Sequence, residues 1–347
     1  MEETTHKRRV RYSGKYPKKF EEKYKEHDPL KYQDTVEKVI SKGSTPAGMH
    51  ISIMVDEIID FLQIKPGQIG FDATLGYGGH TKAMLLKLGN QGHIYATDVD
   101  PIESQKTKER LKAAGFGEDM LTIKLANFCT IDEIAKEAGG FDFLLADLGV
   151  SSMQIDNPDR GFSYKVEGPL DLRLDQSHGI SAAERLSKIT KEELAGMLDE
   201  NADEPYAYEL AEAITNSIKR GNVIDTTTKL RNVIENTLSF IPEKEQKEVM
   251  KKTCQRTFQA LRIDVNNEFE VLYEFMEKLP DALKSGGRAA ILTFHSGEDK
   301  LVKKALKAGL KAGIYSEISS DVIRPSAVEC GRNPRARSTK MRWTIKA

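Results

Sequence analysis

Short apolar runs alternate with amphipathic stretches along much of this chain, and this alternation restricts the fold more than any other feature. The apolar runs that we expect to form strands cover residues 68–73, 92–100, 121–128 and 141–147. The stretches with helical spacing around them cover residues 56–62, 80–88, 103–115 and 131–139. Strands that alternate with helices of this length are typical of a parallel, doubly wound α/β sheet.

The strand pattern stops between about residues 157 and 248, where helical segments follow one another. Residues 256–287 then predict one long amphipathic helix, followed by strands over 288–294 and 341–347. We therefore expect a sheet domain interrupted by an inserted all-helical domain. The predicted parts are a basic, partly disordered amino-terminal extension (1–48), the first part of the sheet domain (49–156), the helical domain (157–250) and the second part of the sheet domain (251–347).

Composition limits the class of protein. A chain of 347 residues with 39% hydrophobic and 30% charged residues predicts a globular protein. No apolar run reaches the roughly 18–20 residues of a membrane span, and no signal peptide is evident, so we expect a cytoplasmic protein without a membrane partner. The three cysteines are far apart and form no CxxC pair, which argues against a disulfide framework or a zinc site. The net charge is −1, but residues 1–20 carry seven Lys/Arg against two acids.

The carboxyl ends of the predicted strands are the place to look for a ligand site. Gly76, Gly78 and Gly79 follow the first strand and precede a helix, where the lack of side chains lets a ligand approach the backbone. Asp98 ends the next strand and could accept hydrogen bonds from both hydroxyl groups of a ribose. Alternatively, Asp98 is a turn residue or the N-cap of the helix that begins near Pro101.

Two cofactor classes fit glycines combined with a ribose-binding acid: a nicotinamide dinucleotide and S-adenosylmethionine. The dinucleotide fingerprint places a third glycine where this chain has Thr81. Asp72, four residues before the first glycine, would repel a pyrophosphate but suits a cationic ligand. Phe128 follows the third strand and either lies against an adenine ring or belongs to the core. The pattern favours S-adenosylmethionine.

The fourth strand ends on Asp147 in the sequence "FDFLLADLGVSSMQ", and further motifs follow. Together with "DATLGYGGHT", "GPLDLRLD", "RTFQALRIDVNNE", "GGRAAILTFHSGEDK" and "NPRARS", this stretch resembles the RsmH (MraW) family of bacterial 16S rRNA (cytosine-N4)-methyltransferases. The resemblance covers about residues 49–347. It implies a class I methyltransferase-like (Rossmann-like) fold, S-adenosylmethionine as donor, and a cytidine in the decoding region of the small ribosomal subunit as acceptor.

The resemblance also implies functions for individual residues. The donor would be held by Gly78, Gly79, His80, Asp98, Phe128, Asp147 and Gln154. We expect Asp147 to be catalytic, because an acceptor beside the donor can bind the hydrogens of the cytosine amine. Gly149 would leave room for the base. For Ser151 and Ser152, hydrogen bonds within the loop are the favoured interpretation, and contact with the cytidine is the alternative.

The partner would be 16S rRNA or the small ribosomal subunit. Candidates for contacts with the RNA are Arg160, Arg256, Arg262, His295, Arg335 and Arg337. His295 has an equally good structural interpretation, because Ser296 and Asp299 have the spacing of a helix capping box. No pair of histidines indicates a metal, and the chain is compatible with a monomer or a homodimer.

Several motifs on the acceptor side differ from the usual family pattern, including "NADEP" at 201–205 and "KTCQR" at 252–256. Three alternatives therefore stay open. The chain could be a divergent second copy of the family that methylates another RNA cytidine, or a ribosome-assembly factor that binds RNA and keeps only the donor fold. An oxidoreductase is the third alternative, which the missing third glycine disfavours.

Overall fold

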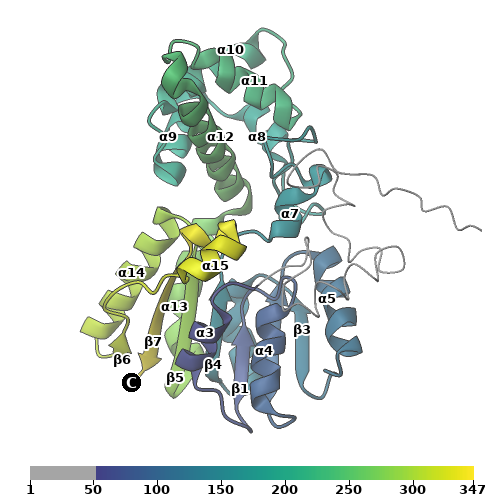
Figure 1. Ribbon diagram of the computed structural model, residues 1–347, viewed down its shortest axis with the longest axis vertical. Helices are drawn as coiled ribbons and strands as arrows, with labels where there is room; N and C mark the ends of the chain where they lie inside the picture. The colour runs from purple at the N-terminus through teal and green to yellow at the C-terminus, as the bar shows by residue number, and fades with distance from the viewer. Residues whose placement is uncertain (1–51) are drawn as a thin grey trace, which may run out of the picture. The chain divides into compact units, whose positions relative to one another are not determined.

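A seven-stranded sheet forms the centre of the region described by the computed structural model, residues 52–347 (Figure 1). The strands are β1 (Ile69–Asp72), β2 (His93–Asp98), β3 (Leu121–Leu125), β4 (Phe141–Asp147), β5 (Leu283–Thr293), β6 (Tyr315–Ile318) and β7 (Lys340–Lys346). Their order is β3-β2-β1-β4-β5-β7-β6, and β7 is antiparallel to both neighbours while the other pairs are parallel. The predicted doubly wound sheet is confirmed. The predicted extension 1–48 lies outside the described residues.

Helices cover both faces of the sheet, because the strands carry apolar side chains on both sides. One face packs against α3 (Val55–Leu62), α4 (Gly79–Leu88) and α5 (Pro101–Ala113), and the other against α6 (Ile131–Ala138), α13 (Glu268–Ala282) and α14 (Ser296–Lys311). In β4, Phe143 and Leu145 join the first core, whereas Leu144 and Ala146 join the second. From Phe143 to Ala146 the strand is therefore apolar and buried on both faces, and it ends on Asp147.

A third hydrophobic core holds the helical region together. Its helices are α8 (Ala182–Lys188), α9 (Lys191–Ala202), α10 (Ala207–Lys219), α11 (Thr227–Thr237) and most of α12 (Glu243–Asn266). Local signals begin several of them: Ser181 caps α8, and Thr190 forms a capping box with Glu193 at the start of α9. The helices expected in this region are present. The helix α12 crosses the predicted boundary at residue 250, and the domain boundaries stay a prediction.

Short elements connect these parts at the carboxyl edge of the sheet. They are α7 (Ser152–Asp156), α15 (Ala327–Arg332) and the 3-10 helices η2 (Phe128–Thr130), η3 (Pro158–Arg160) and η4 (Pro334–Ser338). Ser151 caps α7, with its hydroxyl accepting from the Gln154 backbone N–H while the Gln154 side chain accepts from the Ser151 N–H. For Ser151, the interpretation as a residue that makes hydrogen bonds within its own loop agrees with the structure.

One sequence prediction is wrong in its geometry. The apolar spacing predicted a single long helix over 256–287, but the structure has two helices, α12 and α13, separated by Asn267 in the left-handed conformation (φ 50°). Asparagine tolerates this conformation better than most residues, so the chain can turn there while its apolar spacing continues. The strand β5 also begins five residues earlier than expected, at Leu283.

Among the described residues, no helix combines the length and apolarity needed to span a bilayer.

Candidate active site

The order of strands reverses between β1 and β4, and ligands of open α/β sheets bind at the carboxyl edge beside such a reversal. The glycine turn after β1 lies at this edge. The Gly76 N–H donates to Asp98 Oδ2 (2.8 Å), and its carbonyl accepts from the Thr107 hydroxyl (2.6 Å). Gly76 has a positive φ of 47°, and among residues 52–347 a Cβ there would meet only the Thr74 carbonyl within 4 Å, at 3.8 Å. Open space at this position leaves room for a ligand beside the backbone.

Gly78 and Gly79 are needed for a different reason from the one predicted. A Cβ on Gly78 would lie 2.7 Å from the Thr107 methyl group, and one on Gly79 would lie 2.0 Å from the Ser52 hydroxyl. Gly78 also has a φ of 80° at the N-cap of α4. Close packing of the protein itself therefore accounts for both glycines, and a ligand contact through their backbone stays a prediction.

Asp98 and Asp100 form a hydrogen-bonded end to β2. Asp98 accepts from Gly76 through one oxygen and from the Asp100 N–H through the other (2.9 Å). Asp100, rather than Asp98, is the N-cap of α5, and its side chain accepts hydrogen bonds from the Ile102 and Glu103 N–H groups. Burial raises the pKa of Asp98 to about 6. We refer to Gly76, Asp98 and Asp100 as the β1–β2 edge.

Arg160 binds this edge, and its burial disfavours the predicted contact with RNA phosphate, which stays a prediction. Its side chain is 6% exposed and donates to Asp100 Oδ2 (2.6 Å) and to the Leu174 carbonyl (2.6 Å). Gln154 donates to the same oxygen of Asp100 (3.1 Å). Burial alone would raise the pKa of Asp100, but Arg160 and Gln154 outweigh burial and hold it below its ordinary value. A phosphate could reach Arg160 only by breaking this buried ion pair.

Asp147 lies at the end of β4, and one of its carboxylate oxygens makes no hydrogen bond within the described residues. Its Oδ2 is 3.5 Å from Nδ1 of His80, whose Nε2 lies 2.9 Å from the Ile53 carbonyl. The Oδ1 atom is buried and has no hydrogen-bond partner among residues 52–347. Burial raises the pKa of Asp147 to about 6; the nearby His80 lowers it, and Asp72 and Glu298 raise it further. Asp72 itself is fully buried and accepts from Thr81 (2.6 Å) and Thr74 (3.1 Å).

His295 follows β5 at the same edge, since Asp147 pairs with Leu292 in the sheet. Its Nε2 lies 3.2 Å from Oε1 of Glu298, within ion-pair distance but outside hydrogen-bond geometry, and neither ring nitrogen has a hydrogen bond within the described chain. Burial raises the pKa of Glu298, but His295, the Phe294 N–H and Arg262 outweigh it and the net shift is downward. We refer to Asp147, His295 and Glu298 as the β4–β5 edge.

The capping box predicted for this segment is absent. His295 is the N-cap of α14 and makes no side-chain cap. The Ser296 hydroxyl donates to Asp203 (3.2 Å), and Asp299 binds Arg342 (2.7 Å) and Lys340 (3.0 Å). These partners lie far away in the sequence, so the local spacing misled the prediction.

Arg262 is paired within the chain, which disfavours its predicted contact with RNA; that contact stays a prediction. Its side chain is 14% exposed and donates two hydrogen bonds to Glu268 (2.7 and 2.8 Å). Glu268, His295 and Glu298 each offer a ligand atom, and these atoms lie within 4.8 Å of one another. Such a group could hold a metal ion, but the positive charge of Arg262 against Glu268 already balances part of the negative charge there.

The other predicted contacts differ in exposure. Arg256 is half-buried near the buried Glu204, Arg337 is exposed, and Arg335 binds both oxygens of Asp156 (2.8 and 2.9 Å). Phe128 packs edge-on against Phe275, with ring centroids 5.2 Å apart. This contact makes Phe128 part of the wall of the second core, and whether it also touches an adenine stays a prediction.

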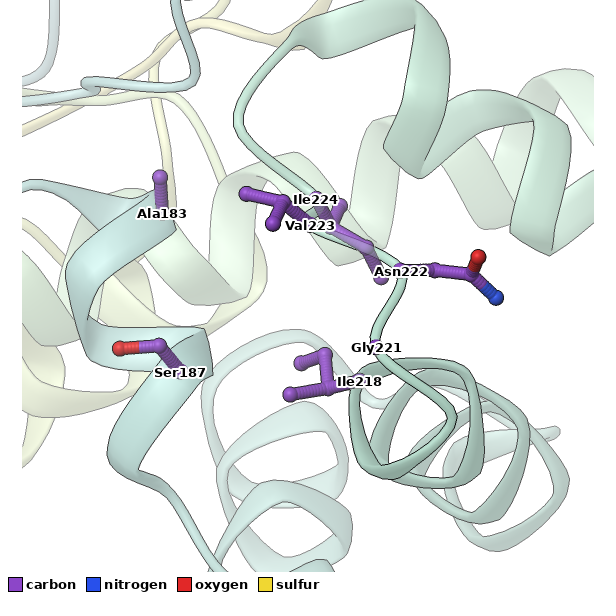
Figure 2. Close-up of a pocket in the computed structure, with 7 residues that line it drawn as sticks. All are labelled: Ala183, Ser187, Ile218, Gly221, Asn222, Val223 and Ile224. Atoms are coloured by element: carbon purple, nitrogen blue, oxygen red, sulfur yellow. The ribbon is translucent and has the colours of Figure 1, made fainter.

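A pocket of about 160 Å³ lies in the helical region, far in sequence from these edges (Figure 2). It is lined by Ala183, Ser187, Ile218, Gly221, Asn222, Val223 and Ile224. Its lining is apolar and includes no charged group, and ligand pockets usually measure roughly 300–1,000 Å³. It is therefore a poor candidate for the donor site.

Comparison with known proteins assigns the family. The model of the "MraW methylase family" matches residues 47–347, which is most of the chain. The chain belongs to the MraW methylase family. Like the family's other members it is a methyltransferase that uses S-adenosylmethionine, and its sheet with a helical insertion is a class I methyltransferase fold.

Two curated relatives of this MraW methylase show how close the resemblance is. "Ribosomal RNA small subunit methyltransferase H 1" of Agathobacter rectalis is 79% identical, covering 100% of this chain and 99% of that protein. "Ribosomal RNA small subunit methyltransferase H 2" of Alkaliphilus metalliredigens is 61% identical over 99% of each chain. Among solved structures, a SAM-dependent O-methyltransferase of Thermotoga maritima is 13% identical, covers 90% of this chain and 71% of that one, and has a TM-score of 0.39.

Sequence reasoning missed two residues that organise the site of this MraW methylase. Asp100 was placed within the expected strand 92–100, although an acid directly before a proline is a common start of a helix and Pro101 opens α5. Glu298 had no local signal, because its partners His295 and Phe294 are recognised only when the loop after β5 is folded.

Proposed function

We propose that this MraW methylase methylates the N4 amine of a cytidine in 16S rRNA of the small ribosomal subunit. The observation that carries the proposal is the buried Oδ1 of Asp147, an acceptor without a partner in the described chain. It lies at the strand end next to the reversal of the sheet, where the donor site is expected. Family membership and the names of the relatives support RNA of the small subunit as the acceptor.

The β1–β2 edge fits S-adenosylmethionine. The carboxylate of Asp98 already accepts two backbone hydrogen bonds, but a carboxylate has about four acceptor sites, so two remain for the hydroxyls of a ribose. Gly76 leaves open space beside it. Asp147, with a pKa of about 6, can supply negative charge for the cationic donor, and Asp72 lies near enough to raise that pKa. Of the other residues predicted to hold the donor, Gly78, Gly79 and His80 begin α4 beside this edge, and Gln154 donates to Asp100. Phe128 follows β3, the strand beside β2.

The acceptor chemistry requires a positioned hydrogen-bond acceptor more than a strong base. The bound donor supplies a methyl group on a positively charged sulfur, which is already electrophilic. The lone pair of the cytosine amine is delocalised into its ring. Asp147 Oδ1 can accept one amine hydrogen, which favours a pyramidal nitrogen and stabilises the positive charge that develops on it. With a pKa of about 6, Asp147 is mostly ionised at pH 7 and can also take the proton that the nitrogen releases.

The RNA side of the site is less complete in the described chain. His295 presents two ring nitrogens without hydrogen bonds and is a candidate to contact the flipped base. Arg337, which is exposed, and Arg335 and Arg256, which are half-buried, remain candidates for phosphate contacts. A ribosomal substrate would place the enzyme in the cytoplasm.

The direct test is nucleoside mapping. Purified protein is incubated with S-adenosylmethionine and either unmodified 16S rRNA or small subunits assembled from it, and the digested RNA is analysed by mass spectrometry. We expect N4-methylcytidine at a single position. Methylation at carbon 5, or at a cytidine of another RNA only, would contradict the proposal. RNA binding without any methyl transfer would favour a ribosome-assembly factor that keeps the donor fold.

A further inference from the structure

A row of lysines covers one face of α14, the helix that begins directly after His295. The exposed lysines are Lys300, Lys303, Lys304, Lys307 and Lys311. With 3.6 residues per turn, this spacing places all five within a stripe about 100° wide on the helix surface. We call this set the lysine stripe.

Packing of the helix fixes which way the lysine stripe faces. The opposite side of α14 carries the buried residues Val302, Leu306 and Gly309. Gly309 lies against the ring of Tyr315 in β6, where a Cβ would be 2.4 Å away. The helix therefore cannot rotate without losing this core contact, and the lysine stripe is held towards solvent.

The lysine stripe lacks the acidic neighbours that usually balance such a face. Lys300 lies 3.7 Å from Asp203, and within residues 52–347 no carboxylate is within 4.0 Å of the other four lysine nitrogens. The acids of α14 itself, Glu298 and Asp299, are buried in its first turn and bind His295, Lys340 and Arg342. Four exposed positive charges thus remain unbalanced.

The start of α12 shows what an ordinary charged helix face looks like in this protein. Lys244, Lys247 and Lys251 are exposed there with similar spacing, but Glu243, Glu245 and Glu248 lie between them. Glu248 also pairs with Lys252 (2.8 Å). Solubility alone therefore explains the lysines of α12, but it gives no reason for a one-signed stripe on α14.

Position connects the lysine stripe to the active site. The strand β5 ends at Thr293 beside the end of β4, where the Leu148 N–H donates to the Leu292 carbonyl (3.1 Å). Three residues later α14 starts and leads away from the β4–β5 edge. With a rise of 1.5 Å per residue, the stripe from Lys300 to Lys311 is about 16 Å long. A chain with regularly spaced negative charges that enters the site could follow it.

We propose that the lysine stripe binds the phosphate backbone of the substrate RNA on one side of the methylated nucleotide. This inference rests on the proposed function, since it takes the acceptor to be an RNA. Lysines act as flexible point charges, so the contact would fix the position of the strand without reading its sequence. The base would be recognised separately, at the β4–β5 edge.

The test compares two triple variants with the same change in net charge. Lys303→Gln, Lys304→Gln and Lys307→Gln together remove the centre of the lysine stripe, and Lys244→Gln, Lys247→Gln and Lys251→Gln are the matched control on α12. Binding to unmodified 16S rRNA is measured between 50 and 200 mM salt, with donor affinity and thermal midpoint as checks of the fold. Each lost phosphate contact lowers the salt slope by about 0.7 for single strands.

We expect the stripe variant to bind RNA roughly 10- to 100-fold more weakly at 0.1 M salt, with a salt slope shallower by about two. Its donor affinity should be unchanged, and the α12 variant should bind RNA as the wild type does. Equal binding by all three proteins, or equal losses in both variants, would overturn the inference. Methyl transfer by the wild type is followed in parallel: if it methylates the RNA and the stripe variant is unaffected, only the lysine stripe proposal fails. If the wild type neither binds nor methylates the RNA, the proposed function fails as well.

Discussion

The two halves of the carboxyl edge of the sheet are built in opposite ways. At the β1–β2 edge, the carboxylates are already engaged: Asp98 accepts two backbone hydrogen bonds, and Asp100 accepts from two N–H groups of α5, from Gln154 and from Arg160. At the β4–β5 edge, Asp147 Oδ1 and both ring nitrogens of His295 are buried without a hydrogen bond in the described chain.

This difference is informative because buried polar groups in native proteins nearly always have a partner. An edge with satisfied groups keeps its geometry before any ligand binds, which suits a donor that returns in every catalytic cycle. An edge with unsatisfied groups is complete only when another molecule supplies the partner. We infer that the β1–β2 edge is preorganised for the donor and that the β4–β5 edge is completed by the acceptor.

The strongest test of this comparison is Asp147→Asn. The amide keeps the size of the side chain but removes the negative charge that would stabilise the methylated nitrogen. We expect kcat to fall about 10³-fold, in the range seen when one group that stabilises transition-state charge is removed. Donor affinity, measured by calorimetry, should change less than about fivefold if the donor is held mainly by the β1–β2 edge. Unchanged turnover at saturating donor would show that Asp147 has no part in transfer.

The second test concerns the β1–β2 edge. Arg160→Met keeps most of the volume of the side chain but leaves Asp100 buried without its cation. We expect a loss of about 3 kcal/mol in the free energy of unfolding by urea, as is common when one partner of a buried pair is removed. Donor affinity should weaken too, because Asp100 N–H holds Asp98.

Arg231→Met is the matched control for Arg160→Met. Arg231 pairs with Glu235 on α11, where both side chains are 41% exposed. Its removal should cost no more than about 1 kcal/mol. If both variants lost the same stability, the ion pair of Arg160 would contribute no more than a surface pair, and the β1–β2 edge would not depend on it.

Only part of this difference between the two edges could be predicted from the sequence. Asp98 and Asp147 could be found because each ends an apolar strand, and the ends of parallel strands meet at one edge. The partners of those acids could not be found. Arg160 is 60 residues from Asp100, and an arginine in a motif has the same appearance whether it binds a phosphate or an internal carboxylate. Because Arg160 is buried against Asp100, the structure favours the internal carboxylate as its partner, and the RNA contact stays a prediction.

Helix boundaries show the same limit. Periodicity located α12 and α13, since their apolar residues recur at helical spacing, but the single left-handed residue Asn267 between them leaves that spacing intact. The capping box expected after His295 failed because Asp299 is bound by Arg342 and Lys340 from β7. The break between α12 and α13 is decided by the backbone of one residue, whereas the contacts of Asp299 join segments that only the folded chain brings together.

The third test is His295→Gln at the β4–β5 edge. Glutamine keeps a donor and an acceptor but cannot place them where the two ring nitrogens lie. We expect kcat/KM for the RNA to fall between about tenfold and a hundredfold, with donor affinity unchanged, because one contact to the base is lost. The free energy of unfolding should fall less than in Arg160→Met, since glutamine can still donate to Glu298, which lies 3.2 Å from Nε2 of His295. A loss of stability comparable to that of Arg160→Met would instead make His295 a structural residue.

The smallest expected effect is in the pH dependence of transfer. Burial raises the pKa of Asp147 to about 6, so the side chain is mostly ionised at pH 7 and about nine-tenths protonated at pH 5. A protonated carboxyl cannot take the proton of the amine, so kcat at saturating donor should be about tenfold lower at pH 5 than at pH 7. In Asp147→Asn, the residual rate should not fall between pH 7 and pH 5. Calorimetry at both pH values separates the pH dependence of transfer from any change in donor binding at the β1–β2 edge. A wild-type rate that stays level between pH 5 and 7 would mean that Asp147 acts without accepting a proton, and the β4–β5 edge would then contribute position and charge alone.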